Sequence, residues 1–163
     1  MRAMDQTDGW LADYSAPRQA GAPANLRLVE DEPQTGARGR ARPFRADLIA
    51  ANDDDREIAI LAVRGEIDLS TAPALRNALR DVIRRETGPI VVDLLEVPFM
   101  DSTGAHVLID TLPHLASQRR RLAIACREGT QVHKLLDLLG LLDELAVHPS
   151  REHALTDLSA APF

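Results

Sequence analysis

The chain has 163 residues, of which 45% are hydrophobic and 27% charged, a composition typical of a soluble globular protein with one ordinary domain and a tail. No stretch approaches the roughly 20 apolar residues of a membrane span, and the first residues lack the apolar core of a secretory signal. The single cysteine, Cys126, excludes an internal disulfide and a multi-cysteine metal site. Residues 1–43 carry six arginines and six carboxylates, so the net charge of −6 falls on residues 44–163, which argues against a nucleic-acid-binding protein. We therefore expect a cytoplasmic protein that binds neither nucleic acid nor membrane.

The first 43 residues show no sustained hydrophobic periodicity and hold eight of the 19 glycines and prolines. Because the segment 36–43 cannot bury apolar surface, we expect a disordered N-terminal extension over residues 1–43. The only tryptophan and the only tyrosine, Trp10 and Tyr14, lie in this extension. They are either a short motif that folds on a partner or incidental residues of an inert tail.

Regular patterns begin at Phe44 and predict an α/β domain over residues 44–163. Alternating and β-branched residues predict a hairpin whose strands lie at 44–50 and 57–63, joined by the turn 52–55. Short apolar runs predict strands buried on both faces, and a weaker pattern predicts one further strand. These three strands are expected at 90–94, 122–126 and 145–148.

Four helices are predicted between and after these strands, with hydroxyl residues at their starts. The expected starts are Ser70–Thr71 with Pro73 following, Ser102, Thr130 and Ser150. Pro113 is expected to kink or end the second helix, and the third is expected to turn Val132, Leu135, Leu136 and Leu139 inward. Strands that alternate with helices predict a mixed sheet of four to five strands with about four helices packed against it.

The segment Asp101-Ser102-Thr103-Gly104 carries the strongest local signal for function. It follows a buried strand, and open α/β sheets place ligands and reactive groups beyond the carboxyl ends of their strands. Ser102 is expected at or beside a helix N-cap, where free N–H groups and the positive end of the helix dipole tolerate a phosphate. Asp68 and Asp101 would make this patch more acidic. The missing side chain of Gly104 would let another backbone or protein approach closely.

From the residues alone, two other interpretations of Ser102 stay open. A serine that opens a helix often serves only as a cap, worth about 1 kcal/mol. Alternatively, Ser102, His106 and Asp110 are spaced by four on one helix face and could form the triad of a small serine hydrolase. Known triads, however, draw their residues from separate elements, and the chain has no Gly-x-Ser-x-Gly motif. His106 is therefore expected at the surface or packed at the helix edge.

No metal or cofactor site is expected. The remaining histidines lack metal-ligand spacing with one another or with Cys126, and the chain has no glycine-rich phosphate-binding loop. Cys126, at the end of an apolar strand, is expected to be a small buried hydrophobic residue.

Two motifs in register resemble the STAS domain of bacterial anti-sigma-factor antagonists. They are Gly65-Glu66-Ile67-Asp68 and, some 25 residues later, Val92-Asp93-Leu94-x-x-Val97-x-Phe99-Met100-Asp101-Ser102-Thr103-Gly104. The resemblance covers about residues 44–158. It implies a non-enzymatic switch built on a mixed sheet with one outer face covered by helices. It also implies that Ser102 is the phosphorylated serine, that Asp68 and Asp101 flank it, and that Thr103 and Gly104 are its helix-opening neighbours.

The resemblance also implies the partners. An anti-sigma factor that is itself a serine kinase would bind the protein while Ser102 is unphosphorylated, and a sigma factor would thereby be released. Phosphorylation of Ser102 would prevent this binding until a serine phosphatase restores the hydroxyl. We expect the partner to dock over the start of the Ser102 helix and the adjacent helix at 130–139. The alternative is a STAS module of a lipid-transport or stress-sensing complex, in which serine phosphorylation can be absent.

Overall fold

The computed structural model describes residues 42–53 and 56–160. The extension expected over residues 1–43, with Trp10 and Tyr14, therefore lies almost entirely outside the described residues, as does the centre of the hairpin turn. In chain order the elements are β1 (Arg45–Asp53), β2 (Arg56–Arg64), α1 (Ala72–Arg85), β3 (Ile90–Glu96), α2 (Ser102–Ser117), β4 (Leu122–Ala125), α3 (Gln131–Leu138), β5 (Val147–His148) and α4 (Arg151–Ala160).

The sheet is mixed, as predicted. Its five strands lie in chain order, β1-β2-β3-β4-β5, with β1 antiparallel to β2 and each later neighbour parallel. The hairpin is longer than the sequence pattern suggests, because β1 and β2 pair continuously from Arg45–Arg64 to Asp53–Arg56. The predicted α/β fold, a mixed sheet of four to five strands with about four helices, is thus confirmed, and the described residues form five strands and four helices.

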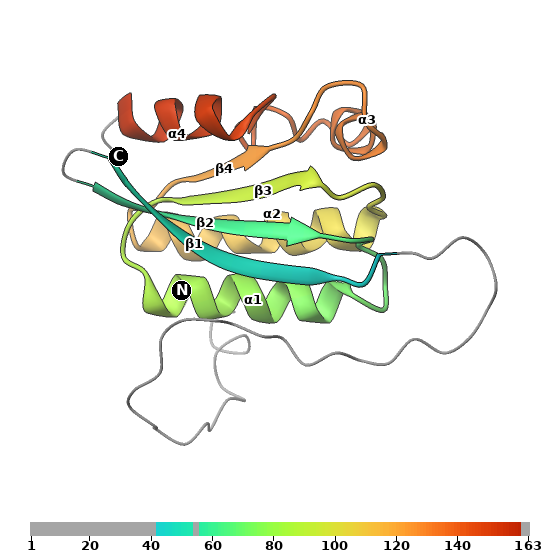
Figure 1. Cartoon of the computed structure of the whole chain (residues 1–163), viewed down its shortest axis with the longest axis horizontal. Coiled ribbons are helices and arrows are strands. Elements are labelled where there is room, and N and C mark those ends of the chain that lie inside the picture. The colour runs from blue at the N-terminus through green and yellow to red at the C-terminus, as the bar shows by residue number, and fades with distance from the viewer. Residues whose placement is uncertain (1–41, 54–55, 161–163) are drawn as a thin grey trace, which may run out of the picture.

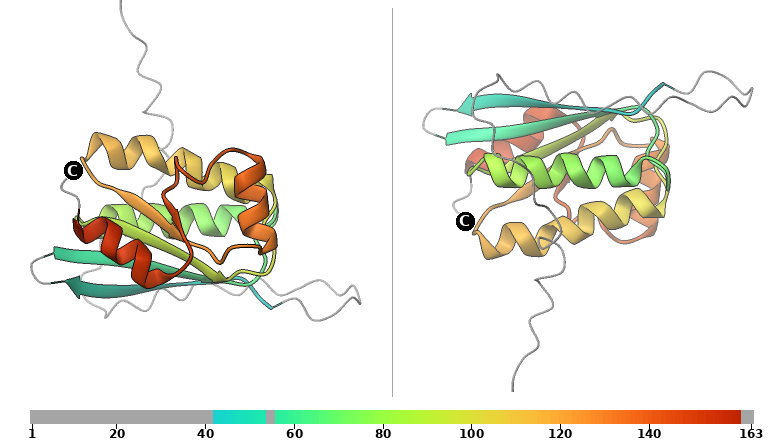
Figure 2. Two further views of the ribbon diagram at one scale, coloured as in Figure 1. Left: turned by 90° about the horizontal axis from the view of Figure 1, so that it is seen from above. Right: turned by 90° about the horizontal axis from the view of Figure 1, so that it is seen from below.

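Helices cover both faces of the sheet, with α1 and α2 side by side on one face and α4 on the other (Figures 1 and 2). The alternation of side chains along the central strands explains this arrangement. Leu61 and Val92 are buried in the core on the α1–α2 side, whereas Ile60 and Val91 are buried with Leu158 of α4 on the other. The expectation of helices on a single face was wrong, because strands that are apolar on both sides must be covered twice.

Two ion pairs join α4 to β3 and to the residue before β4, and the first of them involves a buried carboxylate. Asp93 of β3 is only 4% exposed, and its Oδ2 accepts a hydrogen bond of 2.9 Å from Nε of Arg151, with a second from Nη2. The other oxygen, Oδ1, accepts from the N–H of Leu95. Near the far end of α4, Arg121 donates to the Asp157 carboxylate at 2.9 Å. These two ion pairs add to the apolar contacts of α4 with β3 and β4.

The predicted hydroxyl cap is present at the start of α3 and absent at the start of α1. Thr130 caps α3 as predicted, since its hydroxyl accepts from the N–H of His133 at 3.3 Å. The expected hydroxyl cap of α1 was wrong, because the Thr71 hydroxyl instead donates to the carbonyl of Glu66 at 3.0 Å. The carboxylate of Asp68 accepts the nearby N–H groups in its place.

Two further details of the helices depart from or refine the expectations. Pro113 does not end α2 early, because the helix continues to Ser117. Val132 and Leu136 of α3 are buried as predicted, but Leu139 follows the last turn of the helix and is 43% exposed. Among residues 42–53 and 56–160, no helix combines the length and the apolar composition needed to cross a bilayer.

Candidate functional site

Three loops that follow β2, β3 and β4 meet at one edge of the sheet (Figure 1). These strands are parallel, so their carboxyl ends lie together, which is where open α/β sheets place their functional groups. The loops lead into α1, α2 and α3, and they contain Asp68, Asp101 and Thr130 respectively. The structure thus gathers the sequence-predicted site residues at a single edge.

Main-chain hydrogen bonds hold the first two loops together. The N–H of Ile67 donates to the carbonyl of Phe99 at 2.9 Å, and the N–H of Asp101 donates to the carbonyl of Ile67 at 3.0 Å. Ile67 and Met100 form a short parallel bridge outside the main strands. Asp68 and Asp101 therefore lie in two adjacent loops that main-chain hydrogen bonds hold together.

Asp101, and not Ser102, is the N-cap of α2. Its Oδ1 accepts from the N–H groups of Thr103 at 2.9 Å and Gly104 at 3.3 Å. Ser102 is the first residue of the helix and is exposed. Within the described part of the chain, no hydrogen bond engages the Ser102 hydroxyl. The interpretation of Ser102 as a simple cap was therefore wrong, because the neighbouring carboxylate performs that role.

The Asp68 carboxylate shapes the loop that leads into α1. Its Oδ1 accepts from the Ser70 hydroxyl at 2.6 Å, from the Ser70 N–H at 2.8 Å and from the Thr71 N–H at 3.1 Å. These bonds, first that of the Ser70 hydroxyl, lower the pKa of Asp68, although partial burial opposes them. Asp68 is thus a negatively charged residue at neutral pH whose carboxylate is already bound by its own loop.

Gly104 is buried and faces the interior of the protein. A Cβ at this position would lie 2.6 Å from Cγ2 of Ile67 and 2.7 Å from Cγ of Met100. The missing side chain therefore lets the first turn of α2 pack against the two bridged loops. The expectation that it admits another backbone or protein was wrong, because side chains of the chain itself fill the space.

Gln131, the first residue of α3, contributes a contact that the sequence did not indicate. Its Oε1 accepts from the N–H of Met100 at 2.9 Å, and its Nε2 donates to the carbonyl of Met100 at 2.9 Å. The third loop is thereby bound to the second, two residues before Ser102. A single glutamine at the start of a helix carries no sequence signal for such a contact, which depends on β3 and β4 being neighbours.

The residues of the suggested hydrolase triad do not act on one another. Ser102, His106 and Asp110 are all exposed, and no hydrogen bond among the described residues joins them. Asp110 instead pairs with Arg76 of α1 at 3.5 Å. The described residues also contain no group of three or more histidines, cysteines or carboxylates that could hold a metal ion. Cys126 is buried as expected, and burial raises the pKa of its thiol.

Several exposed apolar side chains belong to the loops at this edge of the sheet or to the end of α3, the helix that begins there. Among the described residues, four of the five exposed large hydrophobic side chains lie after β2, after β3 or at the end of α3, namely Leu69, Phe99, Leu138 and Leu139. Leu138 is 83% exposed and Leu69 is 75% exposed. We call these four residues the apolar rim. Apolar side chains gathered on a surface in this way are typical of protein-binding sites.

The family follows from comparison with known proteins. The STAS domain model matches residues 50–154 of the chain. An anti-sigma F factor antagonist of Paenibacillus polymyxa is 31% identical over 104 residues, which cover 63% of this chain and 88% of that protein. The chain belongs to the STAS-domain family of anti-sigma-factor antagonists. The resemblance noted from Gly65–Asp68 and Val92–Gly104 is thereby confirmed.

Further members of this family support the same placement. An anti-sigma-B factor antagonist of Staphylococcus epidermidis is 32% identical over 101 residues, which cover 62% of this chain and 90% of that protein. The crystal structure of an anti-sigma factor antagonist from Mycobacterium paratuberculosis superposes with a TM-score of 0.60 at 27% identity, covering 71% of this chain and 95% of that one. The names of these antagonists describe binding proteins and not enzymes.

Proposed function

We propose that this chain is an anti-sigma-factor antagonist controlled by phosphorylation of Ser102. In its unphosphorylated form it binds an anti-sigma factor that is also a serine kinase, and this binding releases a sigma factor in the cytoplasm. The observation that carries the proposal is the exposed hydroxyl of Ser102, which no described residue engages, at the first turn of α2. In this proposal residues 44–163 form the STAS domain and residues 1–43 a separate extension.

The partner docks on the edge of the sheet where α2 and α3 begin. The apolar rim supplies the surface whose burial favours association, and the Ser102 hydroxyl lies among the same loops. A kinase bound at this edge reaches the hydroxyl without any change in the fold, because the side chain is already exposed. The same exposure gives access to the serine phosphatase that reverses the reaction.

The capping arrangement determines how a phosphate on Ser102 acts. A phosphoserine carries a charge of about −1.5 to −2. The N–H groups of Thr103 and Gly104 would otherwise receive this phosphate, but the Asp101 carboxylate already occupies them. The phosphate must therefore project from the helix start beside a second negative charge. It opposes docking by its bulk and by like-charge repulsion, which can reach several kcal/mol at a desolvated interface.

The other residues of the site support the phosphoacceptor without contacting the phosphate. Asp68 holds the loop before α1, Asp101 caps α2, and Gly104 allows close packing beneath Ser102. Thr103 donates its N–H to the cap and is half-buried next to the serine. Together they fix the position of the Ser102 hydroxyl at the surface.

Mapping of the phosphorylated residue tests this proposal. The full chain is incubated with ATP and an extract of cells that contain its partner kinase, and the phosphate is located by mass spectrometry. We expect phosphate on Ser102, its loss in Ser102→Ala, and its retention in Ser117→Ala, which removes an exposed hydroxyl from the other end of α2. Phosphate that stays in Ser102→Ala contradicts the proposal. So does an unphosphorylated chain recovered with transporter subunits, the result expected for the transport-module alternative.

A further inference from the structure

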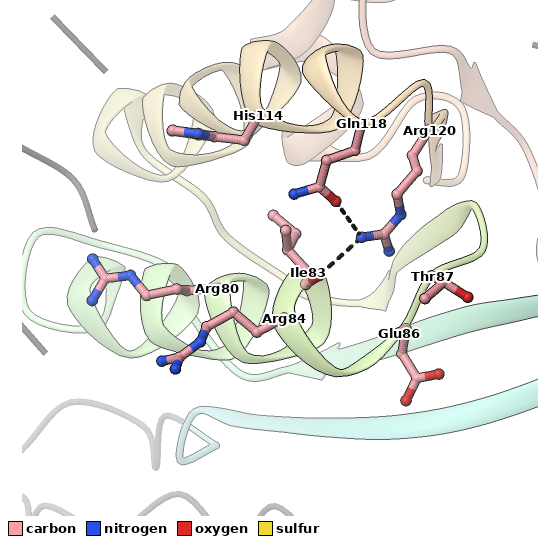
Figure 3. Close-up of a pocket in the computed structure, with 8 residues that line it drawn as sticks. All are labelled: Arg80, Ile83, Arg84, Glu86, Thr87, His114, Gln118 and Arg120. Atoms are coloured by element: carbon pink, nitrogen blue, oxygen red, sulfur yellow. Dashed lines mark hydrogen bonds between the residues drawn. The ribbon is translucent and has the colours of Figure 1, made fainter. Parts of the chain in front are cut away.

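A pocket of about 580 Å³ lies between the carboxyl-terminal ends of α1 and α2 (Figure 3). Its volume is in the range of pockets that bind small molecules. The pocket is at the opposite end of α2 from Ser102, and a helix of 16 residues is about 24 Å long. It is therefore separate from the proposed docking edge.

The lining of the pocket is basic although the domain is acidic. Arg80 and Arg84 lie one turn apart on α1, and Arg120 follows α2 on the other side (Figure 3). His114 of α2 adds a group that becomes positive on protonation. Glu86 is the one carboxylate among the described residues that line the pocket. Three arginines are thus concentrated here, in a part of the chain with a net charge of −6.

Arg120 is a buried cation bonded to neutral acceptors. It is 7% exposed, with Nε donating to the carbonyl of Gly88 at 2.8 Å and Nη1 donating to the carbonyl of Ile83 and to Oε1 of Gln118, each at 2.9 Å. Its Nη2 is buried and has no acceptor within the described part of the chain. Burial lowers the pKa of Arg120, and the charge of Glu86 opposes this. Buried charges are normally paired with an opposite charge, so an anion bound in this pocket would offset the positive charge of Arg120.

Arg120 also has a structural role. Its bonds hold the end of α1, the turn at Gly88 and the end of α2 together. The carboxyl ends of two helices disfavour an anion through their dipoles, but this effect is small beside that of full charges on three guanidinium groups.

We propose that this pocket binds a small phosphate-bearing molecule. The planar guanidinium group matches the geometry of phosphate oxygens, and arginine is the side chain most suited to such recognition. The pocket has room for more than a single phosphate, yet no phenylalanine, tyrosine or tryptophan is among its described lining residues. This lining suits a ligand whose part beyond the phosphate is small and polar, because the ligand does not depend on stacking against an aromatic side chain.

The surroundings favour a molecule free in solution over a lipid headgroup. Of the five exposed large hydrophobic side chains in the described residues, the four of the apolar rim belong to the opposite edge, and the fifth, Ile49, is on β1. None lines the pocket, so no apolar anchor for a bilayer accompanies the basic residues. The negative charge of the domain also opposes binding to an anionic membrane.

Titration of the full chain with soluble phosphate compounds tests this inference. Inorganic phosphate, pyrophosphate and glycerol 3-phosphate are added at about physiological salt, and binding is followed by calorimetry and by amide shifts in NMR spectra. The test variant is Arg80→Gln/Arg84→Gln. The matched control, Arg76→Gln/Arg85→Gln, removes the same charge from α1 outside the pocket lining.

We expect saturable binding of at least one organic or condensed phosphate, with shifts at residues 83–88 and 114–120. We expect the pocket variant to lose at least about tenfold in affinity and the control to change less than about twofold. Equal losses in the two variants, or no saturable binding of any probe, would overturn the inference. Sedimentation with phosphatidylglycerol vesicles without binding of the soluble probes would also overturn it. These results are independent of Ser102 phosphorylation, so they separate this inference from the proposed switch.

Discussion

Gln131 and Met100 are joined by two hydrogen bonds, in which the glutamine amide accepts from the Met100 N–H and donates to the Met100 carbonyl, each at 2.9 Å. This pair connects the start of α3 to the loop that ends at Ser102. Ile67 makes two main-chain bonds to the same loop from the other side. Ser102, the proposed phosphoacceptor, therefore follows a loop that is bound both to the loop after β2 and to the start of α3.

Replacing Gln131 with alanine tests this coupling. Both bonds to Met100 are lost, so we expect the free energy of unfolding to fall by about 1 kcal/mol. We also expect slower phosphorylation of Ser102 by the partner kinase, because the loop before it is no longer held. Urea denaturation and initial phosphorylation rates measure the two effects. Lys134→Ala, at an exposed position of the same helix, is the control and should leave the rate unchanged. A Gln131→Ala rate equal to that of the unmodified protein would contradict the coupling.

Gly104→Ala tests the close packing beneath Ser102. Alanine is the better helix former by about 1 kcal/mol. Its Cβ would, however, lie 2.6 Å from Ile67 and 2.7 Å from Met100, and overpacking typically costs about 1–3 kcal/mol. We expect a net loss of about 1 kcal/mol, measured by urea denaturation, whereas Ser102→Ala at the exposed neighbouring position should change stability little. A Gly104→Ala protein more stable than the unmodified chain would contradict this prediction, because it would mean that the loops move to make room for the Cβ.

The lowered pKa of Asp68 makes the free energy of unfolding depend on pH in the acid range. Its pKa is lowered in the folded protein, chiefly by the Ser70 hydroxyl. The stability that it contributes is therefore complete above its ordinary pKa of about 4 and is lost as the pH falls through the lower folded value. We expect Asp68→Asn to flatten the fall in urea midpoint below about pH 4. Asp47→Asn removes an exposed carboxylate of β1 and is the control. An unchanged acid profile in Asp68→Asn would refute the assignment.

The buried ion pair that fixes α4 gives a fourth prediction. Arg151→Ala would leave the Asp93 Oδ2 without its donor at a position only 4% exposed. We expect a loss of about 2 kcal/mol in the free energy of unfolding, since Arg151 itself is partly exposed. Arg127→Ala, at an exposed arginine outside α4, should have little effect. Similar denaturation midpoints for both variants would mean that the apolar contacts of Leu158 and Ala154 suffice to hold α4.

Local features of this fold could be predicted from the sequence, and the contacts between loops could not. Thr130 caps α3 as predicted because a cap depends only on the residues next to it. The same argument failed at Thr71, where Asp68 lies three residues earlier and accepts the N–H groups instead. At the site, the motif indicated Asp101 and Ser102 but not which of them caps the helix.

Two residues show what the pattern alone leaves out. Gln131 contacts Met100 across 31 positions of the chain, and this depends on which strands are neighbours in the sheet. The role of Gly104 likewise depends on the side chains of Ile67 and Met100 that pack against it. The placement of α4, by contrast, could have been predicted, because strands buried on both faces require helices on both.

The central claim is tested most directly by the affinity of the partner kinase for three proteins, namely the unmodified chain, Ser102→Ala and Ser102→Asp. Ser117→Asp places the same charge at the far end of α2 and serves as the control. We predict that Ser102→Ala and the control bind as tightly as the unmodified chain, and that Ser102→Asp loses at least about tenfold in affinity, the effect of about 1.4 kcal/mol of repulsion at the docking edge. A Ser102→Asp protein that binds as tightly as the unmodified chain would contradict the account.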